Sequence, residues 1–230
     1  MREIVMDTET TGLDPNSGDR IVEIGAVELF NHMPTGKRYH QYINPERDMP
    51  EGAFAVHGLS AEFLSDKPLF NDVAQAFLDF VGDSKMVIHN AAFDMKFINA
   101  ELKWVDRPEL PWPQALDTLA IARKKFPGAQ NSLDALCRRF GIKTERELHG
   151  ALLDSEILAE VYLELIGGRQ PDLVLSVVSN IDSKGSDMAV GWTPPQRPQP
   201  LPSRISDEEV EAHKEFVEKL GEAAVWARYK

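Results

Sequence analysis

The stretch that most constrains the fold is residues 3–10, where an apolar run leads directly into two carboxylates one residue apart. Residues 4–6 are typical of a strand buried in a sheet, whereas Asp7 and Glu9 are not. Alternate side chains of a strand share a face, so Asp7 and Glu9 point to the same side. Such neighbours repel each other unless a cation lies between them. The stretch therefore predicts either a cation site or a turn at Asp7 with Glu9 in solvent.

The composition is that of an ordinary globular chain, with 43% hydrophobic and 27% charged residues among 230, which excludes a fibrous or wholly disordered protein. No apolar run approaches the roughly 20 residues of a membrane helix, and the N-terminus lacks a signal-peptide pattern. We therefore expect no membrane association and a cytoplasmic location. The single cysteine, Cys137, fits a reducing compartment and a small core position.

The net charge of −12 is unusual for a protein that binds nucleic acid by neutralising phosphates. Bound divalent cations would reverse the local sign, and a partner could supply the basic surface. Charge alone therefore does not decide the substrate.

Three strand patterns come first, and strands and helices then alternate. We expect an antiparallel meander of strands at 3–12, 20–30 and 37–45, followed by short strands at 85–90 and 115–119. Helical spacing predicts helices at 67–83, 91–102, 120–126, 131–141 and 150–168, the last with Leu153, Ile157, Val161 and Leu165 on one side. This order predicts an α/β fold, a mixed five-stranded sheet flanked by helices.

The pattern changes after residue 168, which predicts a compact domain at 1–168. Residues 169–204 are rich in proline, as in an extended flexible linker. Residues 205–230 predict a short helix with Val210, Val217 and Leu220 at helical spacing and with His213 among them. Because so short a helix cannot bury its own apolar face, we expect it to dock on another protein.

Three further residues bear on the possible cation site. Asp94 follows a buried strand, where an acid is most often an ordinary first-turn residue favoured by the helix dipole. His149 stands at a helix entrance, where it could simply be a capping or surface residue. Asp154 interrupts an apolar helical stretch and must be paired or bound to metal, since an isolated buried carboxylate is costly.

Together, four carboxylates and one histidine from separate elements suit two divalent ions about 3.5–4 Å apart that promote phosphodiester hydrolysis. Oxygen ligands favour magnesium or manganese over zinc. A histidine, with an ordinary pKa of about 6.5, can accept a proton from the attacking water.

The stretches "DTETTG" (7–12), "HNAAFD" (89–94) and "HGALLD" (149–154) resemble, in order and spacing, the three motifs of the DEDD exonuclease superfamily, in the subtype with a catalytic histidine. The resemblance implies a ribonuclease H-like fold and two-metal hydrolysis from the 3′ end of single-stranded nucleic acid. By position it implies that the metal ligands are Asp7, Glu9, Asp94 and Asp154. It implies His149 as the catalytic base, with Asp7, Glu9 and Asp154 also contacting substrate.

Longer stretches are more closely similar to the family of proofreading subunits of bacterial DNA polymerase III. They are "FAVHGLSAEFLSDKP", "ARKKFPGAQNSLDALCRRFGI" and the "SDEEVEAH" tail. That resemblance implies action on the 3′ end of DNA in the replisome at the nucleoid, attachment to the polymerase α subunit through 205–230, and a small θ subunit in some bacteria. His57 resembles a substrate-contacting position. The chain departs from the family pattern at Glu51 and Gly52, so no substrate role is carried over there.

The segment 170–175 resembles the short peptide that binds the sliding clamp β. The residues that carry this resemblance are Gln170, Asp172, Leu173 and Leu175. The same stretch could equally be the start of the linker.

Two functional classes stay open on the residues alone. The first is a proofreading exonuclease that releases nucleoside monophosphates from mispaired 3′ ends. The second is a non-catalytic adaptor between polymerase and clamp, with the acids as a structural site. A free-standing exonuclease or exoribonuclease would share the motifs, but it has no use for the linker and tail. The preference for DNA over RNA rests on the resemblance, because it depends on how the 2′ position is met.

Overall fold

The computed structural model describes residues 1–144, 148–167 and 205–221. These residues fall into two units, one before and one after residues 168–204. The predicted linker and the clamp-like residues Gln170, Asp172, Leu173 and Leu175 lie outside the described residues. The predicted domain boundary at 168 therefore stays a prediction.

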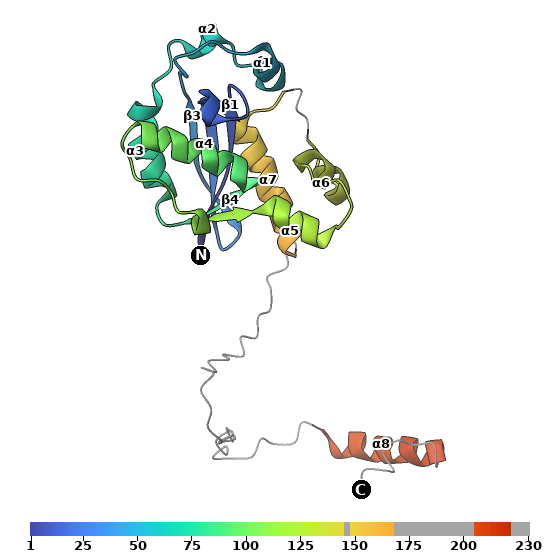
Figure 1. The fold of residues 1–230 in the computed structure, drawn as a ribbon. Coiled ribbons are helices and arrows are strands. Elements are labelled where there is room, and N and C mark those ends of the chain that lie inside the picture. The colour runs from blue at the N-terminus through green and yellow to red at the C-terminus, as the bar shows by residue number, and fades with distance from the viewer. Residues whose placement is uncertain (145–147, 168–204, 222–230) are drawn as a thin grey trace, which may run out of the picture. The chain divides into compact units, whose positions relative to one another are not determined.

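The first unit is built on a mixed five-stranded sheet of order β3-β2-β1-β4-β5 (Figure 1). Its strands are β1 (Arg2–Thr10), β2 (Ile21–Phe30), β3 (Met33–Tyr42), β4 (Lys85–Ile88) and β5 (Ala115–Asp117). β1, β2 and β3 form the predicted antiparallel meander, and β4 and β5 run parallel to β1. The third strand starts four residues earlier than the sequence indicated and ends at Tyr42, because β3 is a largely exposed edge strand without an apolar pattern.

Helices cover both faces of this sheet (Figure 1). α3 (Phe70–Val81) and α4 (Ala91–Trp104) pack on the face that carries Ile4 and Met6. α7 (Ala151–Ile166) packs on the opposite face, which carries Val5. A third cluster joins α7 to α5 (Thr118–Lys125) and α6 (Leu133–Phe140), the two helices that precede it along the chain. β1 is thus buried from both sides, as the apolar run in its first half requires.

Several element boundaries differ from the sequence predictions. Residues 115–119 were expected to be strand throughout, but β5 ends at Asp117, whose side chain accepts a hydrogen bond from Leu119 N at 2.9 Å and so begins α5. Leu153 was expected to share the apolar side of its helix, but it is exposed, while Ile157 is buried. Cys137 is buried, which confirms a core position.

The remaining elements of this unit are short. The sequence analysis did not predict α1 or α2, because one or two helical turns give too few residues for a periodic pattern. The elements are α1 (Glu51–His57), α2 (Ala61–Leu64), α5 (Thr118–Lys125), α6 (Leu133–Phe140) and the 3₁₀ turns η1 (Pro15–Ser17) and η2 (Trp112–Gln114).

A close backbone contact fixes the start of α7 on the sheet. A Cβ atom on Gly25 of β2 would overlap the backbone of Ala151 and Leu152, so this approach requires glycine. Ser155 Oγ donates a hydrogen bond to Gly25 O at 2.8 Å. Asp7 lies opposite Gly25 in the ladder between β1 and β2. The first turn of α7 is therefore held at the level of the acidic half of β1.

The second unit contains α8 (Asp207–Leu220), which confirms the helix predicted in the tail. Ser206 and Glu209 form a reciprocal capping box at its N-terminus. Its apolar side chains, among them Val210, Phe216 and Leu220, are exposed. None of the helices in the described residues combines the length and hydrophobicity that a bilayer crossing requires.

We predict that Gly25→Ala costs about 1–3 kcal/mol of unfolding free energy, because the added methyl group pushes α7 away from β2. Urea unfolding followed by circular dichroism measures the loss. Gly52→Ala is the matched control, since a Cβ atom there meets nothing within 4 Å. Equal stability of the two variants would contradict the close-contact explanation.

Candidate active site

Glu9, His149 and Asp154 come together where β1 meets the start of α7. One ligand atom from each lies within 4.8 Å of the others. His149 Nδ1 is 3.0 Å from Asp154 Oδ2. Glu9 and Asp154 are 8% and 3% exposed, whereas His149 is exposed. The structure thus brings two predicted ligands and the predicted catalytic histidine into one cluster.

Asp7 occupies the same strand as Glu9, two residues earlier. Its neighbour across the ladder is Gly25, the residue against which α7 docks. The period of two in β1 therefore directs Asp7 and Glu9 toward the face that α7 covers. Asp7 is only half-buried, so it keeps access to solvent at the edge of the cluster.

Asp94 reaches β1 from the opposite face of the sheet, in the first turn of α4. Its Oδ1 accepts a hydrogen bond of 2.7 Å from the Oγ1 of Thr8, the residue between Asp7 and Glu9. Asp94 is 2% exposed, and burial raises its pKa to about 7, while the Thr8 hydroxyl acts in the opposite direction. Asp94 is not a member of the three-residue cluster.

Two of the residues that hold this arrangement were not identified from the sequence. Thr8 orients Asp94, and Asp117 anchors the start of α4, because its Oδ1 accepts a hydrogen bond from Asn90 N at 3.0 Å. Asn90 has a left-handed backbone with φ of 69°. The sequence signal for Asp117 is an acid directly before a helical stretch, but nothing local indicates that it also binds the preceding helix.

A cavity of about 480 Å³ adjoins the cluster, between the end of β1 and α1. Glu9, His57 and Phe93 are among the side chains that line it. His57 Nδ1 accepts a hydrogen bond from Leu59 N at 3.0 Å, and burial lowers the pKa of His57, which keeps the ring neutral at pH 7. His149 N donates to Val56 O at 3.0 Å, so the cavity and the cluster share α1 as a wall.

The donor set fits hard divalent cations. Three carboxylates that are more than nine-tenths buried, Glu9, Asp94 and Asp154, converge on one strand end. Burying a carboxylate disfavours its charged form, which is why burial raises the pKa of Asp94, and a nearby cation offsets that cost. Oxygen ligands of this kind suit magnesium-like ions.

A family model described as exonuclease matches residues 4–162 of the chain. DNA polymerase III subunit epsilon of Rickettsia prowazekii is 49% identical over 228 residues, covering 96% of this chain and 97% of the relative. The chain belongs to the epsilon family of exonucleases. The Escherichia coli epsilon subunit is 41% identical over 237 residues, covering 98% of this chain and 97% of the relative. As an epsilon-family member the chain is a 3′–5′ exonuclease, and the family implies divalent metal ions as cofactors.

Solved structures agree with the ribonuclease H-like fold predicted for an epsilon-type chain. Exonuclease X in complex with 5′ overhanging duplex DNA is 29% identical with a TM-score of 0.56, covering 72% of this chain and 90% of that one. The nuclease domain of 3′hExo, bound to rAMP, has a TM-score of 0.63 at 18% identity, covering 72% and 91%. The predicted fold class is therefore confirmed.

Asp94→Asn should change how the stability of the metal-free protein depends on pH. Folding raises the pKa of Asp94 from 3.8 to about 7, so its contribution is fully present below about pH 3.8 and is lost as pH rises through about 7. Asparagine does not titrate. The variant should therefore gain stability relative to wild type as the pH rises from about 3.8 to about 7, by at most about 1.4 kcal/mol per pKa unit, and the difference should stay constant above that range. Urea unfolding with a chelator present measures this difference; an unchanged difference across that range would show that Asp94 ionises normally.

Proposed function

We propose that this chain is the proofreading 3′–5′ exonuclease subunit of a bacterial replicative DNA polymerase, and that it removes mispaired 3′ nucleotides as nucleoside monophosphates. The observation that carries the proposal is the cluster of Glu9, His149 and Asp154 within 4.8 Å, in a chain 49% identical to an epsilon subunit over nearly its whole length. A catalytically inert adaptor, the alternative, would not require buried acids beside an exposed imidazole.

In this proposal Asp7, Glu9, Asp94 and Asp154 hold two magnesium or manganese ions. The ions supply charge stabilisation to the attacking and leaving oxygens of the phosphodiester. β1 contributes ligands from one face through Asp7 and Glu9, and Thr8 on the other face orients Asp94. Asp7, Glu9 and Asp154 also face the substrate phosphate.

His149 is assigned as the general base. Its contact with Asp154 involves Nδ1, so we assign Nε2 as the nitrogen that accepts a proton from the attacking water. The exposure of the ring allows the proton to pass on to solvent. The hydrogen bond from His149 N to Val56 O holds the His149 backbone in place, so that only the side chain needs to move during proton transfer.

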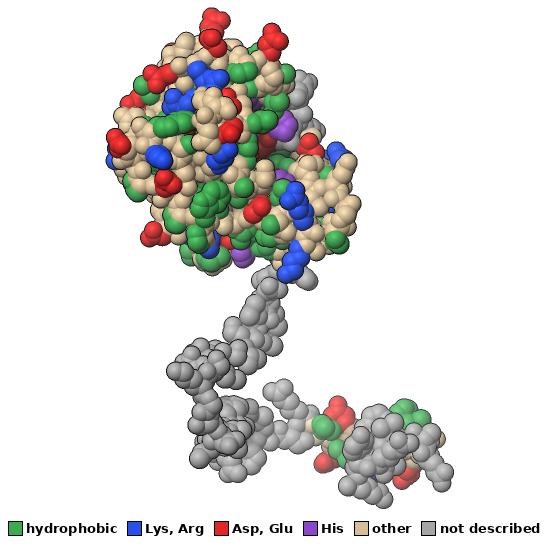
Figure 2. Space-filling view, in the orientation of Figure 1, with side chains coloured by type: hydrophobic (Ala, Val, Ile, Leu, Met, Phe, Trp, Pro, Cys, Tyr) green, Lys and Arg blue, Asp and Glu red, His purple; other side chains and the backbone are tan. Residues whose placement is uncertain are grey.

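The cavity beside the cluster is assigned to the unpaired 3′ nucleotide. At about 480 Å³ it is within the usual range of small-ligand sites, and His57 and Phe93 offer a neutral polar group and an aromatic surface. A mispaired end enters more readily than a paired one, because part of the cost of unpairing and unstacking has already been met. Figure 2 shows basic and acidic side chains interspersed on the face in view, so the cations carry the local attraction for phosphate.

The tail is assigned to partners. The exposed apolar side chains of α8 fit a docking role on the polymerase α subunit, within residues 205–230. Residues 170–175 are assigned to the sliding clamp, and a θ-like subunit is a possible further partner of the exonuclease domain. With these proposed contacts, we assign the protein to the replisome in the cytoplasm.

Asp7→Ala and Asp154→Ala should abolish magnesium-dependent trimming of 3′-labelled DNA, because each removes a proposed ligand. His149→Ala should still bind metal but trim about 10²–10⁴-fold more slowly. The assay compares matched and mismatched 3′ ends with and without α, and Asp79→Ala, an exposed acid on α3, is the control.

Three results of that assay would contradict the proposal. Normal trimming by Asp7→Ala and Asp154→Ala would remove the proposed site. Binding to α without any trimming would favour the adaptor. Trimming of RNA in preference to DNA, with no effect of α, would favour a free-standing exoribonuclease.

The full chain should bind the sliding clamp, and Gln170→Ala together with Leu173→Ala should abolish this binding while leaving trimming unchanged. Surface plasmon resonance with immobilised clamp measures the contact. Unchanged clamp binding by the double variant would exclude segment 170–175 as the clamp-binding site.

A further inference from the structure

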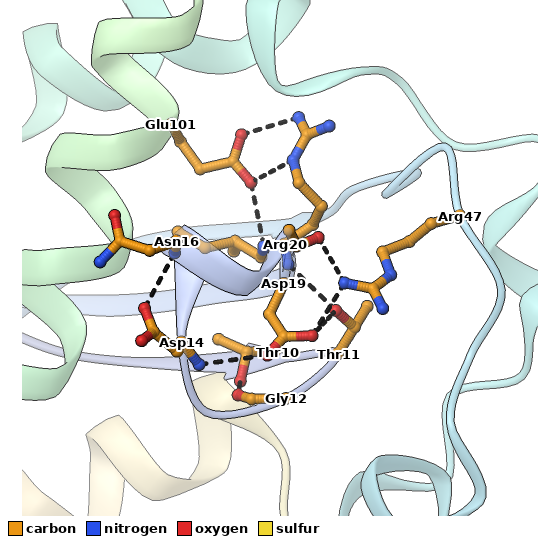
Figure 3. Close-up of polar contacts among 11 residues, drawn as sticks. Thr10, Thr11, Gly12, Asp14, Asn16, Asp19, Arg20, Arg47 and Glu101 are labelled. Atoms are coloured by element: carbon orange, nitrogen blue, oxygen red, sulfur yellow. Dashed lines mark hydrogen bonds and ion pairs between the residues drawn. The ribbon is translucent and has the colours of Figure 1, made fainter.

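An ion pair between Glu101 of α4 and Arg20, the residue before β2, lies away from the cluster. Glu101, at 0% exposure, follows Asp94 by seven residues and so lies on the same side of the helix, two turns on. Its carboxylate accepts hydrogen bonds from Arg20 Nε and Nη2, both at 2.8 Å, and from Ile21 N at 3.0 Å (Figure 3). Burying a charge at this cost requires such complete satisfaction.

The partner of Glu101 is tied directly to the end of β1. Thr11 N donates to Arg20 O at 2.9 Å, and Arg20 N donates to Thr11 Oγ1 at 3.0 Å. Thr11 follows Glu9 by two residues. A continuous series of bonds therefore runs from the Glu9 strand through Arg20 and Glu101 to the helix that carries Asp94 (Figure 3).

Two more contacts join residues 11–20 to α4. The Arg20 guanidinium stacks over the Trp104 ring at 5.0 Å, and Lys96 Nζ lies 2.8 Å from Asp14 Oδ1. Residues 11–20 are themselves cross-linked, since Asp19 accepts hydrogen bonds from Asp14 N at 3.1 Å and from Arg47 Nη1 at 2.8 Å (Figure 3). The connection between β1 and β2, residues 11–20, is therefore attached to α4 through Arg20 and Asp14.

We infer that Arg20 and Glu101 are positioning residues of the metal site, which hold Asp94 at the working distance from the acids of β1. This inference rests on the proposed function. Asp94 comes from the opposite face of the sheet, so the contact between α7 and Gly25 that places Asp154 does nothing for it. Thr8 sets the direction of the Asp94 carboxylate, Asp117 anchors the start of its helix, and the ion pair holds the same helix two turns further on.

If the contacts between residues 11–20 and α4 are weakened, α4 can shift along the sheet, and Asp94 then moves away from the acids of β1. Groups that orient metal ligands typically contribute about 10–100-fold to metal affinity or activity. Glu101→Gln loses the charge and one side of the bidentate pairing, and Arg20→Lys keeps the charge but loses the planar fork. Both variants should bind the more weakly held of two manganese ions at least about tenfold less tightly.

The test titrates the full chain with Mn²⁺, counts free Mn²⁺ by electron paramagnetic resonance, and measures kcat and KM for trimming across Mg²⁺ concentrations. Glu28→Gln is the matched control: Glu28 is also buried, pairs with Arg2 and accepts from Thr35 Oγ1 at 2.9 Å, but lies toward the opposite end of β2. The same measurements in an Asp94→Asn background complete a double-mutant cycle.

We expect Glu101→Gln and Arg20→Lys to weaken Mn²⁺ binding and to lower kcat, with KM for DNA unchanged. Glu28→Gln should change neither Mn²⁺ binding nor kcat. The effect of Glu101→Gln should vanish in the Asp94→Asn background. Wild-type Mn²⁺ affinity in both variants, or an equal effect of Glu28→Gln, would overturn the inference and leave the proposed function intact. Failure of the wild type to bind Mn²⁺ would instead remove the proposed function. If Glu101→Gln does not fold, Arg20→Lys decides alone.

Discussion

The cost of burying carboxylates is the constraint on which this structure depends. Glu9, Asp94 and Asp154 are all nearly buried around one strand end, where unneutralised charge is most costly. Burial raises the pKa of Asp94 to about 7, so folding by itself disfavours the charged form of that carboxylate. The scaffold has to hold these groups together before any cation is bound, and most of the unusual features of the chain serve that purpose.

β1 can serve as the shared centre because its two faces have different tasks. Asp7 and Glu9 point toward α7, while Thr8 points toward α4 and bonds Asp94. A separate contact holds the helix on each face. On one face α7 packs against Gly25, and on the other the ion pair of Arg20 and Glu101 holds α4. Neither contact covers the side chain of His149, which therefore stays exposed to solvent.

The net charge of −12 is compatible with action on a nucleic acid. An excess of acids would repel a nucleic acid strand, but the clustered acids are proposed to bind cations, and the adjoining cavity is lined largely by uncharged groups. Attraction for the substrate then depends on the bound ions, and a second source of attraction is the polymerase to which the tail is proposed to attach.

The sequence alone predicted the meander, the alternation that follows it, the helix in the tail and the candidate site acids at 7, 9, 94 and 154, because strand and helix periods and the order of motifs are local properties. It misplaced the end of β5 and the exposure of Leu153, since a side-chain cap and the packing of a helix depend on neighbours distant in sequence. The folded structure was needed to see that Asp94 reaches β1 from the face opposite Asp154, and that Gly25, Thr8 and Glu101 make contacts beside the proposed ligands. A glycine, a threonine and a glutamate look ordinary in the sequence, and their roles arise from contacts across 86 residues for Thr8 and 130 for Gly25, which no local pattern encodes.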